Sequence, residues 1–480
     1  MSGYQHRTKE GWSYFPTRDG LKQGFVTEGA IQPKTSFAAK KSLAQFDTIV
    51  IGAGYTGLTA ARDLTLAGVH WQQGFVWREL VRYGLDRRLK ITPNEDFPDY
   101  AVNRTVYDGK VYEEKYEPNF KMLDDAFGRL VDVDGAKGVT VNAIPTQVIE
   151  GPLVNDDLVN KFDKMSVADR VAECRAKNIL SERELAYLIP WVELSFGAKL
   201  ADCSFLELVK WYQHGNQSFF FLGSTLWFYK LIDGQSHLAR RMFDEAFETG
   251  NLCYAFEHDV RSIIDRHGSV EVVTDKASFK ATKVVSTLPQ NVANRVKFDP
   301  PLSALRREAF EVGHVNKGNK IHSEIAKPEM RSITLNGFDS KNPMVLEAAF
   351  GDQNLKNGNV AVVAFGAGNT SEAEEASKHP EDIKKWVGRL HPELEQNYVG
   401  SIWKDWNQDT HAQGTWCMYG PGHYTKYFKE LKKPHGNILF ASADWADGWK
   451  SFIDGACEEG TRAAYTITQE WRKRPQPARL

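Results

Sequence analysis

One segment restricts the fold of this chain more than any other. A six-residue apolar run, Phe46–Ile51, is followed by a glycine-rich turn and then by a helical pattern from Leu58 to Leu66. The turn has the pattern GxGxxG and consists of Gly52, Ala53, Gly54, Tyr55, Thr56 and Gly57. In a strand–turn–helix of this kind the first glycine permits the tight turn, the second lets the backbone approach a pyrophosphate, and the third lets the helix pack on the strand. The helix N-terminus adds free N–H groups and a partial positive charge. The segment therefore predicts a dinucleotide site, in preference to a sharp turn without a ligand.

The same pattern requires an acidic residue about 20 residues further on, at the end of a second strand, to bind the ribose. Here the chain passes from Gly68 and Val69 directly into a loop and helix pattern, from His70 to Leu80. Glu79 has roughly the right spacing, but it lies within the helical pattern. We therefore do not expect Glu79 to bind the ribose, and the second strand with its acid is missing.

Composition excludes several classes of function. The 480 residues contain 60 Lys and Arg against 62 Asp and Glu, which argues against nucleic acid as the main partner because phosphates require an excess of cations. No apolar run approaches the ~20 residues of a membrane helix, and residues 1–33 lack the apolar core of a secretory signal. Five isolated cysteines without a Cys/His cluster predict a reducing compartment and no metal site.

The rest of the chain alternates between helical and strand-like patterns, which predicts an α/β core interrupted by helical insertions. Helices are predicted for most of Asn155–Ala198 and over 234–246, 372–390 and 452–472. Strands are predicted over 260–264, 270–273, 284–286, 320–325, 360–365 and 437–442.

Motifs along nearly the whole chain resemble those of the flavin-containing amine oxidases, most closely the fungal monoamine oxidases. The most specific is the C-terminal block, which joins Phe440–Trp445 to Gly448–Ala456 and Glu459–Ala464. Further matches lie at 19–24, 50–60, 233–236, 239–241 and 313–316. The resemblance implies an α/β fold with a discontinuous Rossmann-like FAD-binding domain and a mixed α+β substrate domain.

The resemblance also implies a division of the chain. Residues 1–42 are an irregular leader; 43–85, 235–300 and 420–470 form the FAD-binding domain; 86–234 and 301–419 form the substrate domain; and 471–480 are a tail. In this family the first helix is followed by the second strand, its ribose-binding glutamate and a loop along the flavin. Several dozen such residues are missing between Val69 and His70, so either a coding segment was skipped or part of the cofactor site was lost. Loss of the strand would leave Phe46–Ile51 without a partner on one edge.

Individual residues take roles from the resemblance. Residues 52–57 match the pyrophosphate loop, and Val260 matches a backbone contact to the adenine end, although its side chain is also typical of a sheet core. Asp444 matches an acidic position near the ribityl or phosphate region, and Ile453 a helix N-terminus whose N–H reaches a flavin carbonyl. Lys320 matches a lysine that holds a water at flavin N5, although a lone lysine is more often a solvated charge.

Two aromatic residues match a pair that face each other in front of the flavin in this family. These are Trp416 and Phe452, which would form a slot for a narrow amine, although two core aromatics give the same pattern. The cysteine that binds flavin covalently in the animal enzymes is replaced by Thr415 or displaced to Cys417. The resemblance therefore implies noncovalent FAD.

The implied reaction is transfer of a hydride equivalent from an amine to the flavin, hydrolysis of the imine to an aldehyde, and reoxidation by O₂ to give H₂O₂. Partners would be a small-molecule amine and O₂, with no nucleic acid and no membrane span, and an oligomer is compatible with the sequence. Two alternatives stay open: a cofactor-impaired binding protein with this fold, and a flavin oxidase of a secondary-metabolite intermediate. The C-terminal Ala478, Arg479 and Leu480 resemble a peroxisomal address, against an arbitrary basic tail or a cytoplasmic location.

Overall fold

The predicted strand, glycine turn and helix are all present in the computed structural model, as β5 (Phe46–Ile51) and α1 (Tyr55–Thr65). The structure describes residues 4–30, 46–66, 74–91, 102–141, 156–227, 229–266, 268–368 and 376–473. The junction between Val69 and His70 and the C-terminal tripeptide lie outside the described residues. The missing segment and the peroxisomal location therefore stay predictions.

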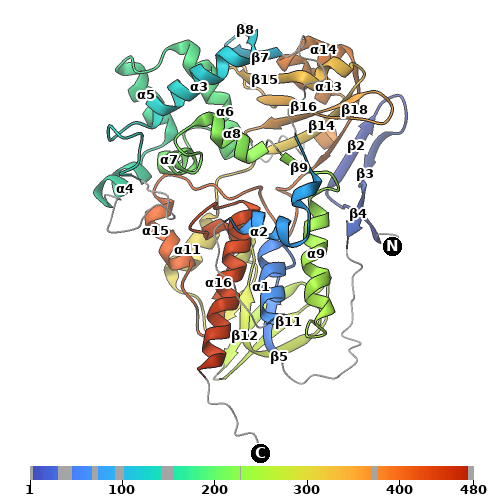
Figure 1. Ribbon diagram of the computed structural model, residues 1–480, viewed down its shortest axis with the longest axis vertical. Helices are drawn as coiled ribbons and strands as arrows, with labels where there is room; N and C mark the ends of the chain where they lie inside the picture. The colour runs from blue at the N-terminus through green and yellow to red at the C-terminus, as the bar shows by residue number, and fades with distance from the viewer. Residues whose placement is uncertain are drawn as a thin grey trace, which may run out of the picture.

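The glycine turn belongs to a six-stranded sheet in the lower half of Figure 1. Its strand β5 pairs in parallel with β12 (Ser278–Ser286), and β12 pairs in parallel with β19 (Ile438–Phe440). The last residues of the three strands share one register, so the three following segments leave the sheet at the same edge. The other strands are β10 (Val260–Arg266), β11 (Ser269–Thr274) and β13 (Lys297–Asp299).

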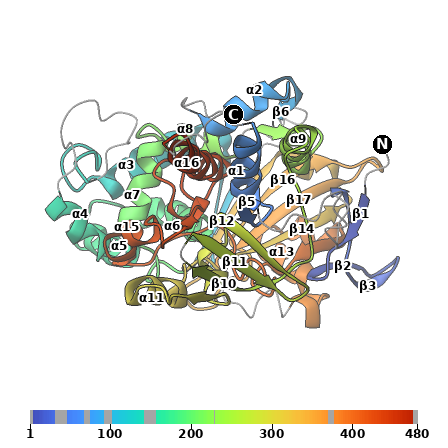
Figure 2. The same cartoon turned by 90° about the horizontal axis from the view of Figure 1, so that it is seen from below.

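Three helices lie side by side over one face of this sheet: α1, α9 (Gln235–Glu248) and α16 (Ile453–Arg472) (Figures 1 and 2). Thr56 at the start of α1 lies against Gly460, and Asp63 one to two turns later accepts a hydrogen bond from Thr461. The order of these contacts shows that α1 and α16 run parallel. Both helices therefore begin at the edge of the sheet that carries the glycine turn.

A nine-stranded sheet forms the upper half of Figure 1, in the order β3-β2-β18-β14-β17-β16-β15-β7-β8. The bounds are β2 Gly11–Phe15, β3 Gly20–Gln23, β7 Val102–Tyr107, β8 Lys110–Lys115, β14 Asn319–Ile325, β15 Ile333–Phe338, β16 Ala348–Asn354, β17 Val360–Gly366 and β18 Tyr398–Lys404. Two short pairs lie apart from it: β1 (Tyr4–Arg7) with β4 (Val26–Ala30), and β6 (Leu89–Ile91) with β9 (Tyr229–Leu231).

A helical layer packs on the upper sheet, as the sequence predicts for residues 155–198. Its buried side chains form one large cluster with Ala348 of β16. The helices of this layer are α3 Tyr116–Val131, α4 Asp156–Asp163, α5 Val167–Ala176, α6 Glu182–Phe196, α7 Phe205–His214 and α8 Phe219–Trp227. The remaining helices are α2 Phe75–Arg82, α10 Gln290–Ala293, α11 Ala304–Val312, α13 Asp382–Leu390, α14 Pro392–Gln396 and α15 His423–Leu431.

Two expectations from the sequence are wrong. The leader is not irregular over residues 4–30, because β2 pairs with β18 and β3 extends the nine-stranded sheet. Pairing across almost 400 residues leaves no local signal in the sequence. The helix predicted over 372–390 is interrupted by a turn at 379–381, where Pro380 cannot continue a helix, and α13 begins only at Asp382.

The α/β class is confirmed, and the strands of the two sheets come from segments that alternate along the chain. The exact domain bounds stay a prediction. Within the described residues, no helix is long and apolar enough to cross a membrane. Over the same part of the chain, no three His, Cys, Asp or Glu side chains are grouped as metal ligands would be.

Candidate functional site

The glycine turn is closed by the segment that follows β12. Gly52 has φ of +106°, which favours glycine, and a Cβ atom there would lie within 3.0 Å of the Thr287 hydroxyl. That hydroxyl donates to the carbonyl of Ile51 at 2.7 Å. A Cβ atom on Gly57 would collide with the carbonyl oxygen of Gly52. The first and third glycines are therefore required by packing within the protein.

Gly54 is different, because a Cβ atom built there would meet no heavy atom within 4 Å. Gly52, Ala53 and Gly54 are all exposed. The first amide of α1 that is bonded within the helix is that of Leu58, which donates to Gly54 at 2.9 Å. The amides of residues 55–57 precede it and have no partner in the described structure. Open space, free N–H groups and a helix N-terminus together fit a phosphate group.

The other half of the expected dinucleotide site does not fit. Among the described strands, β5 pairs with β12 alone, so its second edge carries no neighbour. Glu79 is fully buried in α2, where Arg62 donates to both of its carboxylate oxygens and Arg78 binds it at 2.8 Å. Glu79 is thus paired with two arginines, and among the described residues no acidic side chain ends a second strand after the glycine turn, where the motif requires one.

The start of α16 lies beside the start of α1, between the two halves of the molecule (Figure 1). Ile453 is the first residue of α16, and the amides of residues 453–455 have no partner in the part that the structure describes. The next side chain, Asp454, accepts a hydrogen bond from the amide of Val76 at 2.7 Å and so caps the start of α2. Burial raises the pKa of Asp454. The backbone of Ile453 is therefore placed as the sequence predicts, although its flavin contact stays a prediction.

Asp444 follows β19 at the carboxyl edge of the sheet. The side chain is buried and accepts a hydrogen bond from the amide of Gln290 at 2.7 Å. The amide of Asp444 itself donates a hydrogen bond to the Ser442 hydroxyl oxygen at 3.2 Å. Burial raises the pKa of Asp444. The carboxylate therefore joins the segments after β12 and β19, which lie beside the glycine turn.

Val260 begins β10 and is half-buried against the core of the six-stranded sheet, together with Ile49 of β5. Its Cα partner in the neighbouring strand is Thr274. The side chain therefore has the core role that the sequence also allowed, and the backbone contact to an adenine stays a prediction.

Lys320 lies on β14 beside Phe365 of β17, with its Nζ atom 5.4 Å from the ring centroid. The residue is exposed, but neighbouring protein atoms reduce its hydration and lower its pKa. The nearest acid that stabilises its charge, Asp352, is already paired with Lys230. Lys320 is thus a lysine without an ion pair of its own in the described structure.

Trp416 and Phe452 border the same buried cluster, but the ring contacts of Phe452 are with two other residues. The indole N–H of Trp416 donates to the carbonyl of Ser195 at 2.7 Å. Phe452 packs on Trp211 and Trp449, with ring centroids 5.3 and 5.4 Å away. The facing pair stays a prediction. The sequence reasoning missed Trp211 and Trp449, although Trp449 lies inside the C-terminal block.

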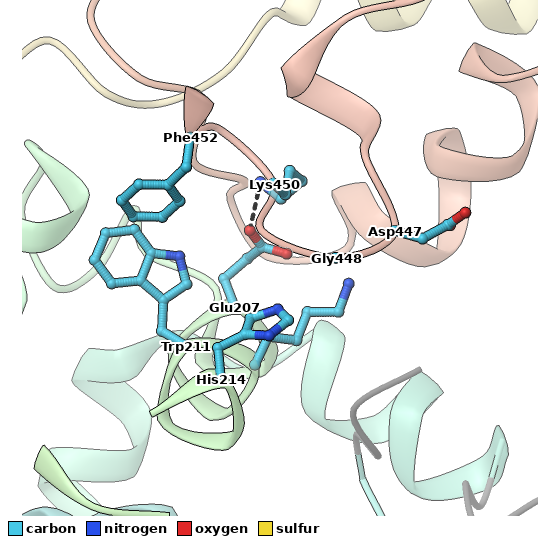
Figure 3. A pocket seen from close by; sticks show the side chains of 8 residues that line it. Glu207, Trp211, His214, Asp447, Gly448, Lys450 and Phe452 are labelled. Atoms are coloured by element: carbon cyan, nitrogen blue, oxygen red, sulfur yellow. Dashed lines mark ion pairs between the residues drawn. The ribbon is translucent and has the colours of Figure 1, made fainter. Parts of the chain in front are cut away.

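A small cavity of about 10 Å³ lies beside Phe452, between α7 and the loop before α16 (Figure 3). Lys450 forms a buried ion pair with Glu207 across it, at 2.7 Å. Burial lowers the pKa of Lys210 to about 8. His214 stacks on Trp449 at 4.7 Å, and burial together with Lys210 lowers its pKa to about 4. The cavity is therefore lined by two half-buried side chains with lowered pKa values, Lys210 and His214, which no sequence motif indicated.

The comparisons with known proteins agree with this architecture. A family model described as flavin containing amine oxidoreductase matches residues 63–468. The chain is 25% identical to pseudooxynicotine dehydrogenase of Pseudomonas sp., over 89% of this chain and 87% of the relative. It is 25% identical to (S)-6-hydroxynicotine oxidase of Paenarthrobacter nicotinovorans, over 88% of this chain and 99% of the relative. Cyclohexylamine oxidase from Brevibacterium oxydans IH-35A superposes with a TM-score of 0.66 at 17% identity, over 89% of this chain and all of that one. Wild-type putrescine oxidase bound to putrescine superposes with a TM-score of 0.65 at 19% identity, over 88% of this chain and 99% of that one. The predicted amine oxidase architecture is confirmed.

We predict that the glycines of the turn respond differently to substitution. Gly57→Ala should lower the free energy of unfolding by about 1–3 kcal/mol, because its Cβ meets backbone. Gly54→Ala should cost less than about 1 kcal/mol, since only its capping position is affected. Urea denaturation of both variants measures the difference. Equal losses of the free energy of unfolding in the two variants would contradict the view that Gly54 leaves space for a ligand and not for packing within the protein.

A second prediction concerns acid stability. The folded-state pKa of His214 is lowered to about 4, so between that value and its ordinary pKa the unfolded state binds more protons. The stability that the neutral His214 contributes is present above pH 6.5 and is lost as the pH falls toward 4. His214→Phe should reduce the loss of stability between pH 7 and pH 5 by roughly 1–2 kcal/mol. His379→Phe, at a side chain 56% exposed, is the control, and an unchanged loss in H214F would refute the prediction.

Proposed function

This chain belongs to the flavin-containing amine oxidoreductase family, and we propose that it oxidises a small-molecule amine with noncovalently bound FAD, with O₂ reduced to H₂O₂. The observation that carries the proposal is the open space at Gly54, at the edge where α1 and α16 both begin. The flavin, when bound, supplies the redox chemistry. The residues of the chain bind the flavin, orient the amine and exclude water.

The side chains in front of the proposed flavin fit an amine that reacts in its neutral form. Trp416 is held by its bond to Ser195, and Phe452 by Trp211 and Trp449. Apolar rings disfavour an ammonium ion and so favour the neutral amine. We assign Lys320, whose pKa is lowered because neighbouring protein atoms reduce its hydration, the role of holding a water near the reacting atoms.

Noncovalent binding is supported by the two residues that could replace a flavin-linking cysteine. The hydroxyl of Thr415 donates to the side chain of Asn316. Cys417 is fully buried, and burial raises the pKa of its thiol well above the ordinary value. A buried neutral thiol is a poor nucleophile, so neither residue favours a covalent link.

The names of the relatives support an amine as the substrate class without favouring one amine. They include a pseudooxynicotine dehydrogenase, a 6-hydroxynicotine oxidase, a putrescine oxidase and a cyclohexylamine oxidase. A second candidate, a binding protein with this fold and an impaired cofactor site, is favoured by one observation. The acidic residue nearest to the expected ribose position, Glu79, is fully engaged by Arg62 and Arg78.

The deciding experiment mixes the FAD-loaded protein with amines in the absence of oxygen. Nicotine-type cyclic amines, putrescine and cyclohexylamine form the panel, and loss of the oxidised flavin absorbance is the measurement. We expect bleaching by at least one amine and H₂O₂ release when air is admitted, detected with a peroxidase-coupled dye. Protein that binds flavin but is bleached by none of them would contradict amine oxidation, and protein that binds no flavin would support the binding-protein alternative.

We further predict that Lys320→Met slows amine-dependent flavin reduction or its reoxidation by roughly 10- to 100-fold, because a positioned group near the reacting atoms is lost. Flavin affinity should stay the same, since Lys320 lies on β14, away from the phosphate end. Stopped-flow absorbance separates the two half-reactions. Lys297→Met, on the exposed face of β13, is the matched control. A variant as fast as the parent would remove Lys320 from the site.

A further inference from the structure

The chain has no acidic residue between Asp63 and Glu79. This stretch covers the positions at which a ribose-binding acid would follow the glycine turn. Asp63 itself lies on α1 and is bound by Arg62 at 2.7 Å and by Thr461 at 3.1 Å. The loss therefore concerns the sequence itself and does not depend on how residues 67–73 are arranged.

Glu79 cannot substitute for the missing acid. Its side chain and that of Arg62 are both completely buried, and their ion pair is the closest in a cluster that includes Asp63 and Glu245. Turning Glu79 outward would leave the Arg62 charge buried with one fewer carboxylate, which is strongly unfavourable. The acid is thus committed to holding α2 against α1.

The acids nearest to the predicted adenine end do not replace the missing acid either. Asp259, just before β10, pairs with Arg261 at 3.0 Å. Glu257 has only a distant, exposed contact with Lys276 at 3.9 Å, and no described strand directs it toward the glycine turn. The free edge of β5 offers no strand from which another side chain could reach the ribose in the described part of the chain. Among the described residues near the glycine turn, we therefore find no charged side chain placed to bind the ribose of an adenosine.

The phosphate next to the flavin, in contrast, has a suitable binding site. Gly54 leaves open space at the start of α1, and the amides of residues 55–57 have no partner among the described residues. α16 also begins beside α1, between the two halves of the molecule (Figure 1), and the amides from Ile453 on likewise lack a described partner. FAD and FMN have this phosphate, the ribityl chain and the flavin ring in common. They differ only in the AMP half, for which the described residues offer no charged contact.

We infer that this chain binds its flavin through the mononucleotide half alone and does not distinguish FAD from FMN. The inference rests on the proposed flavin site. A charge-assisted hydrogen bond to the ribose would correspond to roughly a 10- to 100-fold difference in affinity. Without one, the dissociation constants for FAD and FMN lie within about threefold of each other.

The test uses the full chain, freed of bound flavin and titrated with FAD, FMN and riboflavin, with quenching of tryptophan fluorescence as the readout. We expect equal affinities for FAD and FMN, weaker binding of riboflavin, and no displacement of FMN by ADP in hundredfold excess. Tenfold or tighter binding of FAD than of FMN would overturn the inference, as would displacement of FMN by ADP.

Two variants sharpen the result. Gly54→Ala fills the space at the phosphate, so it should weaken FAD and FMN equally and leave riboflavin unchanged; a larger loss for FAD would contradict the inference. Glu79→Gln tests for a hidden ribose contact. It should leave the affinity for FAD relative to that for FMN unchanged, even if the protein becomes less stable. Weaker binding of FAD with unchanged binding of FMN would show that Glu79 binds the ribose.

The outcomes separate this inference from the proposed function. A preference for FAD overturns the inference alone. Equal binding of FAD and FMN without reduction by any amine overturns amine oxidation and supports the inference. Binding of none of the three flavins overturns both.

Discussion

The close, parallel approach of α1 and α16 determines where a cofactor can bind in this protein. Gly460 touches the carbonyl of Thr56, and a side chain of any size at that position would push the helices apart. Because the helices run in the same direction, their unpaired amides and their partial positive charges lie at one end, beside the turns that follow β5, β12 and β19. The register of three parallel strands brings these turns to one edge, where ligands bind in sheets of this kind. The proposed flavin site follows from these two constraints.

The buried Arg62 cluster limits the same site. Burial by itself would lower the pKa of Arg62, but Asp63 and Glu79 raise it above the ordinary value. An arginine with no exposed surface is stable only when carboxylates surround it. The cluster therefore fixes α2 on α1 and uses the acids that lie closest to the glycine turn. Stability of the fold and recognition of a ribose compete here for the same side chains, and the structure uses them for the fold.

The sequence predicted those parts of the molecule that depend on local patterns. The bounds of β5 are those of the apolar run, and α16 begins within one residue of the predicted helix, because a strand pattern and a long amphipathic pattern each have a clear period. The role of Gly54 as an open position also followed from its spacing. The strands of residues 4–30 could not be predicted, since β2 finds its partner β18 almost 400 residues away. Ring contacts such as that of Phe452 with Trp211 likewise join distant segments, and no spacing rule indicates them.

The position of Phe452 depends on the residues just before it. Ser451 adopts φ of +76°, a conformation that costs a residue other than glycine about 1–3 kcal/mol. The turn is held by the hydroxyl of Ser451, which donates to the carbonyl of Cys417, and by the amide of Ser451, which donates to Ala443 at 2.9 Å. Lys450 adds an ion pair to Glu207 of α7, with both side chains buried.

Removal of one partner from such a buried ion pair costs about 3–5 kcal/mol, more than the strain at Ser451. The pair is therefore strong enough to offset the strain of the backbone turn that precedes Phe452, whose ring packs on Trp211 and Trp449. Burial alone would lower the pKa of Lys450, but the carboxylate of Glu207 beside it helps to raise it above the ordinary value, so the ammonium stays charged and the pair persists over the physiological range. A contact between α7 and the start of α16, remote from the glycine turn in the sequence, thus sets where the aromatic wall of the proposed substrate site stands.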